Sequence, residues 1–478
     1  MNKKTIINNL AKILMVEAIL MIPPMIISLG YKEYKDALSF LYVIVPTLIV
    51  TILLGRIKGE RLGARDGYII VASAWIFISL IGAIPLYLSG AFESYICALF
   101  EIVSGFTTTG ASVMDDPGVL GHGMQFFRCF SHWVGGMGVL VFVLMIMPME
   151  NDSSMHLVRA EVPGPTAGKI VPKMSQTSRI LYGIYAGITA ILAIILIALK
   201  MPWFDALCYA FGTAGTGGFS ISSAGITAYN SPAIEIVISV FMLICGVNFN
   251  VYYLVLLGKI KEAFKTEELT IYLGIVLSSV VLIGVNIYKT IGTVFDAFRL
   301  SLFQVSSIMT TTGFATADYS LWPQFSQHLL VLLMIIGGCA GSTAGGMKVS
   351  RVIILWKSFL AEIRSVMNPK QIITVRVNNQ VVSERTLRST RIYASTYLII
   401  ICLSTLILSL NGLDFTTNVT AVLACFNNIG PGLNLVGPMA NFSVYSDWGK
   451  LFLSIIMLTG RLEIFPMFLL FAKSAHEK

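Results

Sequence analysis

The chain has 478 residues, of which 56% are hydrophobic and only 12% are charged, and its mean hydropathy is +0.80. A water-soluble protein of this size cannot bury so much apolar surface, so the composition predicts an all-α polytopic membrane protein. The net charge of +8 does not indicate nucleic-acid binding, because the basic residues follow membrane sidedness. The seven cysteines never form a C-x-x-C pair, which argues against a disulfide framework or a zinc site.

The first two apolar windows, 13–28 and 37–55, are joined by the short loop 31–36. They predict a helical hairpin, although the first window carries Glu17. Neither window leads into a loop rich in threonine and glycine, unlike the rest of the chain. We therefore expect residues 1–66 to form a leader pair of helices that stands outside the repeats.

A repeating unit begins at residue 67. The window 67–92 is long enough to span a bilayer, whereas 93–106 covers only roughly 20 Å of helix and predicts a re-entrant pore helix. That short helix runs into a Thr/Gly loop, and 129–149 crosses back. The predicted unit is therefore span, pore helix, loop, span.

The same order recurs three more times. The predicted repeats cover 67–178, 179–267, 268–390 and 391–478, with second spans at 129–149, 236–258, 319–347 and 451–472. Each pore helix begins with an acidic residue, which suits a helix N-terminus and is interpreted as a cap: Glu93, Asp205, Asp296 and Asp414.

Four related loops follow the pore helices, with the sequences FTTTGAS (106–112), GTGGFS (215–220), TTTGFA (310–315) and FNNIGPG (426–432). Their glycines are 108, 95 and 117 residues apart when counted at 110, 218, 313 and 430. One such loop is usually a helix C-cap or a polar turn. Four copies in the same setting favour pseudo-fourfold symmetry around one central pore, lined by rings of carbonyl oxygens that replace the hydration shell of a cation.

The glycine-rich stretch 337–346 is too flexible and polar for an ordinary spanning helix. It cannot be a phosphate loop, because Met347 stands where lysine is required. Close helix packing through small residues is one interpretation, and a mobile constriction beneath the four loops is the preferred one.

Arg461 lies about 15 Å along the last predicted span, near the membrane centre. A charge at that depth usually faces water or protein, so we expect either an interhelical salt bridge or a pore-facing arginine that raises the barrier for cations. Glu463 is a poor salt-bridge partner for Arg461, because residues two positions apart on a helix do not share a face.

Basic residues divide unevenly between the two sides of the membrane. With the N-terminus inside, the inner segments hold 25 of the 33 Lys and Arg residues. This predicts cytoplasmic termini and Thr/Gly loops that face the outer side. The largest inner connection, 348–391, has nine basic and two acidic residues and is a candidate contact for a cytosolic partner or anionic lipid.

These motifs together resemble the Trk/Ktr/HKT superfamily of potassium transporters, most closely its TrkH/TrkG-type bacterial membrane subunit. The resemblance covers nearly the whole chain and is carried by GFTTTG (105–110), GGFS (217–220), NNIGPGL (427–433) and GRLEIF (460–465). It implies a multi-pass protein of the bacterial cytoplasmic (inner) membrane that transports potassium ions without an organic cofactor. It also implies a homodimer with one pore per protomer and a cytosolic, nucleotide-binding TrkA-like subunit.

The resemblance also implies roles for particular residues. Filter positions that would hold potassium are Thr108, Thr109, Gly110, Thr216, Gly217, Gly218, Thr311, Thr312, Gly313, Asn428, Ile429 and Gly430. The intramembrane gate would comprise Gly337, Gly338, Gly341, Ser342, Thr343, Gly345, Gly346 and Arg461. In the fourth loop, Gly432 is the alternative to Gly430 as the filter glycine.

Other functions remain open at this point. The same architecture could serve a sodium-permeable pore or a proton-coupled cation symporter. An organic-solute carrier would need inverted repeats, whereas these repeats run in one direction. An intramembrane enzyme is weaker still, because the chain has no H-E-x-x-H or G-x-S-x-G motif, and no catalytic residue is predicted.

Overall fold

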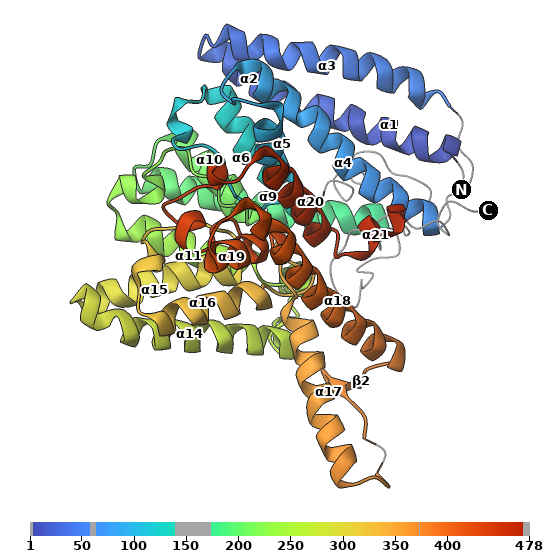
Figure 1. The fold of residues 1–478 in the computed structure, drawn as a ribbon, viewed down its shortest axis with the longest axis vertical. Coiled ribbons are helices and arrows are strands. Elements are labelled where there is room, and N and C mark those ends of the chain that lie inside the picture. Colours follow the sequence, from blue (N-terminus) through green and yellow to red (C-terminus); the bar gives the residue numbers. More distant parts are fainter. Residues whose placement is uncertain (1–2, 58–63, 139–173, 372, 472–478) are drawn as a thin grey trace.

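The computed structural model describes residues 3–57, 64–138, 174–371 and 373–471, and these are mostly helical. Within those ranges, six helices are long and apolar enough to cross a membrane, or seven if one bent pair counts as a single span. The strands there, β1 (Arg376–Val377) and β2 (Gln380–Val381), form a small antiparallel hairpin. In Figure 1, the N-terminal helices lie along one side of the body and α14 lies on the opposite side.

The leader windows are helical. Helices α1 (Lys3–Leu20) and α2 (Ile22–Gly30) together make one 28-residue apolar segment, and α3 (Tyr34–Gly55) returns beside α1. Helix α1 also packs against α4 (Ala64–Ser89), the next long helix. The leader is thus longer at its N-terminal end than the charge-free window predicts, because Lys3, Lys4 and Lys12 belong to the helix.

Each of four long helices is followed by a short one. The long helices are α4, α9 (Met174–Ala198), α14 (Glu267–Ile291) and α18 (Glu384–Leu408). The short helices are α5 (Tyr95–Phe106), α10 (Trp203–Gly215), α15 (Val294–Met309) and α19 (Phe415–Phe426). The C-terminal halves of the short helices are buried on every side, so protein rather than lipid surrounds them.

The expected acidic caps are wrong in three of the four short helices. Only Asp414 occupies an N-cap, where its carboxylate accepts from the Thr417 amide. Ser94 and Thr293 cap α5 and α15 through their hydroxyl groups. Asp205 and Asp296 lie in the first helical turn, and Glu93 precedes its cap. A carboxylate one turn inside still interacts favourably with the helix dipole, while a short hydroxyl side chain reaches the free amide.

The second spans of repeats two, three and four are interrupted rather than continuous. This corrects the continuous windows predicted for repeats two and four, whereas an irregular stretch at 337–346 was expected in repeat three. Their segments are α11 (Pro232–Cys245) with α12 (Phe249–Leu256), α16 (Gln324–Ile336) with α17 (Val349–Met367), and α20 (Asp447–Arg461) with α21 (Phe465–Phe471). The axes of α11 and α12 differ by 91°. In repeat one, α6 covers His122–Gly136, and residues 139–149 of the predicted span lie outside the described residues.

Close backbone contact accompanies two of these helix ends. A Cβ atom at Gly135 would lie 1.8 Å from the Phe106 carbonyl oxygen, and one at Gly460 would lie 1.8 Å from that of Phe426. Only glycine allows the second span to approach the end of a pore helix so closely. The ends of α6 and α20 therefore lie at the level of the Thr/Gly loops, which hydropathy alone does not reveal.

The connecting segments contain short helices, and α17 projects away from the body with the β-hairpin beside it (Figure 1). Helix α13 spans Ile260–Ala263, and the 3-10 turns are η1 (Pro117–Val119), η2 (Gly225–Tyr229), η3 (Tyr319–Leu321), η4 (Ser409–Asn411), η5 (Asn434–Val436) and η6 (Phe442–Val444).

Candidate functional site

All four short helices end in the same backbone motif. A residue at the C-cap or directly after it is left-handed in every case, with φ of 56° at Thr108, 54° at Thr216, 54° at Thr311 and 56° at Asn428. The amide of the following residue then donates to the carbonyl five residues earlier, at 2.8 Å in all four loops. This is a Schellman-type helix end, made here with threonine or asparagine instead of the usual glycine. We call residues 107–110, 215–218, 310–313 and 427–430 the ring loops.

The last residue of each ring loop is a glycine with positive φ. The angles are 77° at Gly110, 83° at Gly218, 86° at Gly313 and 102° at Gly430. Gly432 does not share this conformation. The structure thus places Gly430, rather than Gly432, at the position equivalent to Gly110.

The ring loops touch one another in a closed cycle. A Cβ atom at Gly110 would lie 2.0 Å from the carbonyl oxygen of Gly217 in the next loop. The same relation links the remaining neighbours: Gly218 to the Thr312 oxygen at 2.0 Å, Gly313 to the Ile429 oxygen at 1.9 Å, and Gly430 to the Thr109 oxygen at 2.7 Å. The residues predicted from four distant stretches are therefore brought together, and the glycines make room for the neighbouring carbonyl groups.

Ring loops one and three are supported by their own threonines. The hydroxyl groups of Thr107 and Thr109 are 2.8 Å apart, and those of Thr310 and Thr312 are also 2.8 Å apart. The first hydroxyl of each pair additionally donates to a carbonyl one helical turn earlier. These pairs hold the side chains behind the loop backbone.

Ring loop two is supported by His132 on α6, which sequence analysis did not single out. His132 Nδ1 lies 2.8 Å from the Gly105 carbonyl oxygen, and Nε2 accepts from the Phe219 amide at 3.2 Å. These partners require a neutral imidazole protonated at Nδ1. A Cβ atom at Gly217 would lie 2.1 Å from the imidazole ring, so histidine occupies the space that glycine leaves.

Ring loop four depends on residues far away in the sequence. Asn428 Nδ2 donates to Thr109 Oγ1 and to the Met457 carbonyl, each at 3.0 Å. Tyr397 donates to Asn427 Oδ1 at 2.9 Å. Asparagine replaces threonine here because its longer amide reaches the neighbouring loop and the second span.

A buried ion pair lies behind ring loops one and two. Arg128 Nη2 and Glu101 Oε1 are 2.6 Å apart, and both side chains are at most 1% exposed. Glu101 also accepts from the Val113 amide, while the Arg128 guanidinium lies 4.2 Å from the ring centre of Phe219. The sequence contained one signal for this ion pair: Glu101 and Arg128 each lie in an otherwise apolar segment. An acidic and a basic residue in such segments of a membrane protein usually pair with each other.

The predicted gate residues 337–346 form most of an irregular loop between α16 and α17. We call residues 337–348 the Gly-rich loop. Its Cys339 amide donates to the Gly246 carbonyl at 3.0 Å, and its Gly341 carbonyl accepts from the Phe249 amide at 3.0 Å. The Gly345 amide donates to Thr311 Oγ1 at 2.6 Å. The loop therefore contacts both the break between α11 and α12 and ring loop three.

Arg461 contacts the Gly-rich loop. Its Nη1 donates to the Thr343 carbonyl at 3.1 Å, and its Nη2 donates to the Gly136 carbonyl at 2.8 Å and also to that of Gly135. Glu463 instead pairs with Arg351 at the start of α17. The two ionisable groups of the last span thus contact the middle of the Gly-rich loop and the first turn of α17.

The ring offers oxygen atoms rather than a cluster of metal-binding side chains. Within the residues that the structure describes, no group of three or more His, Cys, Asp or Glu side chains could hold a metal ion. Backbone carbonyls suit a weakly bound alkali cation better than a transition metal.

Comparison with known proteins identifies the family. The family model for TrkH, a cation transport protein, matches residues 38–478. The chain belongs to the TrkH family of cation transport proteins. This family membership agrees with the resemblance drawn from the motifs, and it is a transporter family rather than an enzyme family.

The similar proteins cover this TrkH-family chain almost completely. It is 35% identical to the Trk system potassium uptake protein TrkG of Escherichia coli K12, over 95% of this chain and 94% of that protein. It is 34% identical to the Trk system potassium uptake protein TrkH of Halomonas elongata, over 100% of both chains.

The crystal structure of the potassium transporter TrkH from Vibrio parahaemolyticus has the same fold. It superposes with a TM-score of 0.90 at 29% identity and covers 100% of both chains. The predicted class, an all-α multi-pass membrane protein, is therefore confirmed.

Proposed function

We propose that this protein mediates potassium uptake across the bacterial cytoplasmic membrane, through a filter formed by the four ring loops. The observation that carries the proposal is the closed cycle of glycine-to-carbonyl contacts around the ring. The names of similar proteins, which are potassium uptake proteins of Trk systems, support potassium as the transported ion.

The chemistry of the ring suits a dehydrated monovalent cation. Carbonyl oxygens of the residues before each glycine would replace its hydration shell, and the threonine and asparagine side chains would hold those carbonyls in place. The short helices end at the ring, so their C-terminal dipole ends add negative potential there. The residues assigned to potassium binding are Thr108, Thr109, Gly110, Thr216, Gly217, Gly218, Thr311, Thr312, Gly313, Asn428, Ile429 and Gly430.

The Gly-rich loop is the proposed gate. Its bond to Thr311 keeps it next to the ring, and Arg461 adds a positive charge at its Thr343 carbonyl. Displacement of both would open the path for cations. The gate residues are Gly337, Gly338, Gly341, Ser342, Thr343, Gly345, Gly346 and Arg461.

The remaining features of the proposal concern sidedness and assembly. The excess of Lys and Arg in alternate connections supports cytoplasmic termini and a filter open to the outer side. Homodimer formation, lipid contact and a cytosolic TrkA-like nucleotide-binding subunit follow from family resemblance, and the Trk system names of the relatives fit a multicomponent assembly.

The decisive experiment measures ion flux in proteoliposomes, with potassium and sodium tested separately and a proton gradient present or absent. We expect potassium flux that needs no proton gradient and falls in the Gly110→Ser variant. Equal sodium flux would support a sodium-permeable pore, and dependence on the gradient would support a proton-coupled symporter. Loss of all flux, even after the cytosolic subunit is added, would overturn the proposal.

A further inference from the structure

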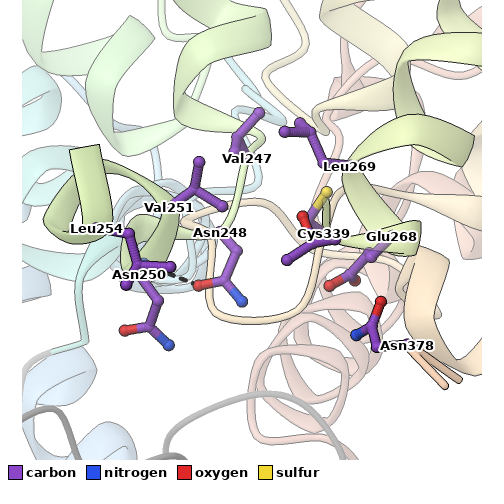
Figure 2. A pocket seen from close by; sticks show the side chains of 10 residues that line it. Val247, Asn248, Asn250, Val251, Leu254, Glu268, Leu269, Cys339 and Asn378 are labelled. Carbon is purple, nitrogen blue, oxygen red and sulfur yellow. Dashed lines mark hydrogen bonds between the residues drawn. The ribbon is translucent and has the colours of Figure 1, made fainter. Parts of the chain in front are cut away.

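A cavity of about 240 Å³ lies beside the Gly-rich loop, at the N-terminal end of α14 (Figure 2). Its lining mixes apolar side chains of α12 and α14 with the polar side chains of Asn248, Asn378 and Glu268, and includes Cys339 of the loop. In Figure 2, Glu268 and Cys339 lie on the same side of the cavity, with Asn248 opposite. The loop therefore has an open space on this side rather than close packing.

Glu268 connects the cavity wall to both ends of the Gly-rich loop. Its Oε1 atom accepts from the Ala340 amide at 2.7 Å and from the Ser350 amide at 3.1 Å. Ala340 lies near the start of the loop, and Ser350 lies in the first turn of α17. One carboxylate oxygen thus bridges two backbone segments that would otherwise be separated by the loop.

The neighbouring residue links α14 to the β-hairpin. The Glu267 amide donates to Asn378 Oδ1 at 2.8 Å, and the Asn378 amide donates to Glu267 Oε2 at 3.2 Å. Glu267 also forms an ion pair with Lys357 of α17. Adjacent carboxylates on one helix therefore hold the hairpin on one side and the Gly-rich loop on the other.

We propose that Glu268 is a positioning residue that latches the Gly-rich loop closed, and that the hairpin tip at Asn378 sets its position through Glu267. The inference rests on the proposed role of the loop as a gate. When the hairpin moves, the first turn of α14 moves with it, and the two amides lose their shared acceptor. The cavity then provides room for the loop to leave the ring.

Two features of the Gly-rich loop indicate that its contact with Glu268 can open and close, rather than only stabilise one conformation. A carboxylate that accepts two amide hydrogen bonds is a strong acceptor, and its donors lie at the two ends of a glycine-rich segment. The loop's glycines at 337, 341 and 346 have positive φ, so the backbone can rearrange between conformations that other residues resist. One acceptor therefore controls a flexible segment.

The native Cys339 thiol provides the test, because it is only 1% exposed while the loop is closed. Purified full-length protein with Cys402→Ser, which removes the exposed cysteine, is labelled with N-ethylmaleimide and followed by mass spectrometry. The variants are Glu268→Ala, Glu268→Asp and Asn378→Ala. The matched control is Glu262→Ala, whose carboxylate is 63% exposed and pairs only at 3.5 Å with Lys259.

We expect Glu268→Ala to accelerate Cys339 labelling by about tenfold, because loss of a hydrogen bond to a charged group is worth about that factor in an opening equilibrium. Glu268→Asp keeps the charge but withdraws the oxygen, so its acceleration should be intermediate. Asn378→Ala should have a smaller effect in the same direction, and Glu262→Ala should match the parent protein. Glu268→Gln, whose amide oxygen can still accept from both amides but carries no charge, should label more slowly than Glu268→Ala.

A Cys339 labelling rate within about twofold of the parent in both Glu268→Ala and Glu268→Asp, in monodisperse protein, would overturn the latch, because a lost charged hydrogen bond predicts a larger change. Potassium flux is measured on the same variants and should rise with labelling. Accelerated labelling with no flux in the parent or any variant, even after the cytosolic subunit is added, would leave the latch intact and reject the transport proposal. Flux with unchanged labelling would reject the latch alone.

Discussion

Ring loops one and three each contain a pair of bonded hydroxyl groups of their own, whereas ring loops two and four have no such pair and are held by bonds to residues outside the loop. Loops one and three each carry a pair of threonine hydroxyls 2.8 Å apart. Loop two is held by His132, and loop four by Asn428 and Tyr397. The backbone motif is nevertheless the same in all four. Backbone geometry therefore defines the ring, while each loop has its own side-chain support.

The four repeats also differ at a second position, on the short helix that precedes each ring loop. The residue nine positions before each ring glycine is Glu101, Tyr209, Gln304 or Ala421. Glu101 accepts from Ser112, Val113 and Arg128. Gln304 Oε1, with its amide oriented to satisfy both donors, accepts from the amides of Thr316 at 2.9 Å and Ala317 at 3.1 Å. Repeat one thus uses a charge where repeat three uses a neutral amide.

The largest expected effect follows from adding a methyl group to the ring itself. In Gly218→Ala, the new Cβ would meet the Thr312 carbonyl at 2.0 Å, so the ring must shift. We expect potassium flux in proteoliposomes to fall at least about tenfold, or about 1.4 kcal/mol in barrier height.

The matched control for this substitution is Gly292→Ala. Gly292 has φ of 90°, but nothing lies within 4 Å of the position that the new methyl group would take, so this variant isolates backbone strain from steric contact. Its expected cost is about 1–2 kcal/mol of stability, with flux preserved. Equal flux in both variants would contradict the ring as the selective element.

The second prediction compares Glu101, the charged residue at this position in repeat one, with Gln304, the neutral residue at the same position in repeat three. Glu101→Gln leaves Arg128 buried without its carboxylate partner, and removal of one partner from a buried pair costs about 3–5 kcal/mol. Gln304→Ala leaves two amides without an acceptor, at about 1–3 kcal/mol each, so its loss should be similar in size although no charge is left unpaired. Thermal unfolding in detergent measures both variants, and a loss below about 1 kcal/mol in either one would refute the support assigned to that residue.

A smaller difference is expected between equivalent threonines. Thr109 Oγ1 contacts Thr107 and also accepts from Asn428, while the hydroxyl of Thr312 is joined to that of Thr310. Because each bond contributes about 0.5–1.5 kcal/mol, Thr109→Val should lower the potassium-to-sodium flux ratio more than Thr312→Val. Identical ratios would mean that the cross-loop bond to Asn428 does not shape selectivity.

The smallest effect lies far from the ring, at the tip of the leader hairpin. Burial raises the pKa of Glu33, but hydrogen bonds from His122 and Gly123 outweigh burial and lower that pKa below its ordinary value of 4.5. A carboxyl group whose pKa is lower in the folded state than in the unfolded state stabilises the fold at pH values above its unfolded-state pKa. That contribution is lost as the pH falls through the folded-state pKa.

The melting temperature of the parent protein should therefore exceed that of Glu33→Gln at about pH 6, and the gap should close as the pH falls below 4.5. The contribution should be no more than about 1 kcal/mol, because the contact is partly exposed. A gap that widens in acid would have the wrong sign for this linkage.

Much of the architecture was predictable from local patterns. Apolar windows predicted the leader hairpin and the long helices, and short apolar segments before Thr/Gly sequences predicted the four half-length helices. The breaks at 246–248 and 462–464 were missed. Each is only three residues long, and a hydropathy window averages its polar residues, Asn248 and Glu463, with the longer apolar stretches on either side. The break in repeat three was visible only because its glycines are so numerous.

The supports of the ring were largely invisible for another reason. His132 lies in an apolar helix, where a lone histidine has no distinctive spacing, and its acceptor role depends on Phe219, 87 residues away. Arg351 as the partner of Glu463 is equally non-local, with 112 residues between them. Sequence proximity carries no information about such contacts.

The amino-acid sequence by itself determined the membrane class, the four short helices and the chemistry of the loops that follow them, because hydropathy, helix length and Thr/Gly composition act over a few neighbouring residues. Tertiary structure alone decided which loop lies beside which and which glycine of the fourth loop joins the ring. It also decided that Asn428 reaches Thr109 across 319 residues. Those outcomes depend on how helices pack in three dimensions, where backbone contacts at glycines and single buried hydrogen bonds select one arrangement.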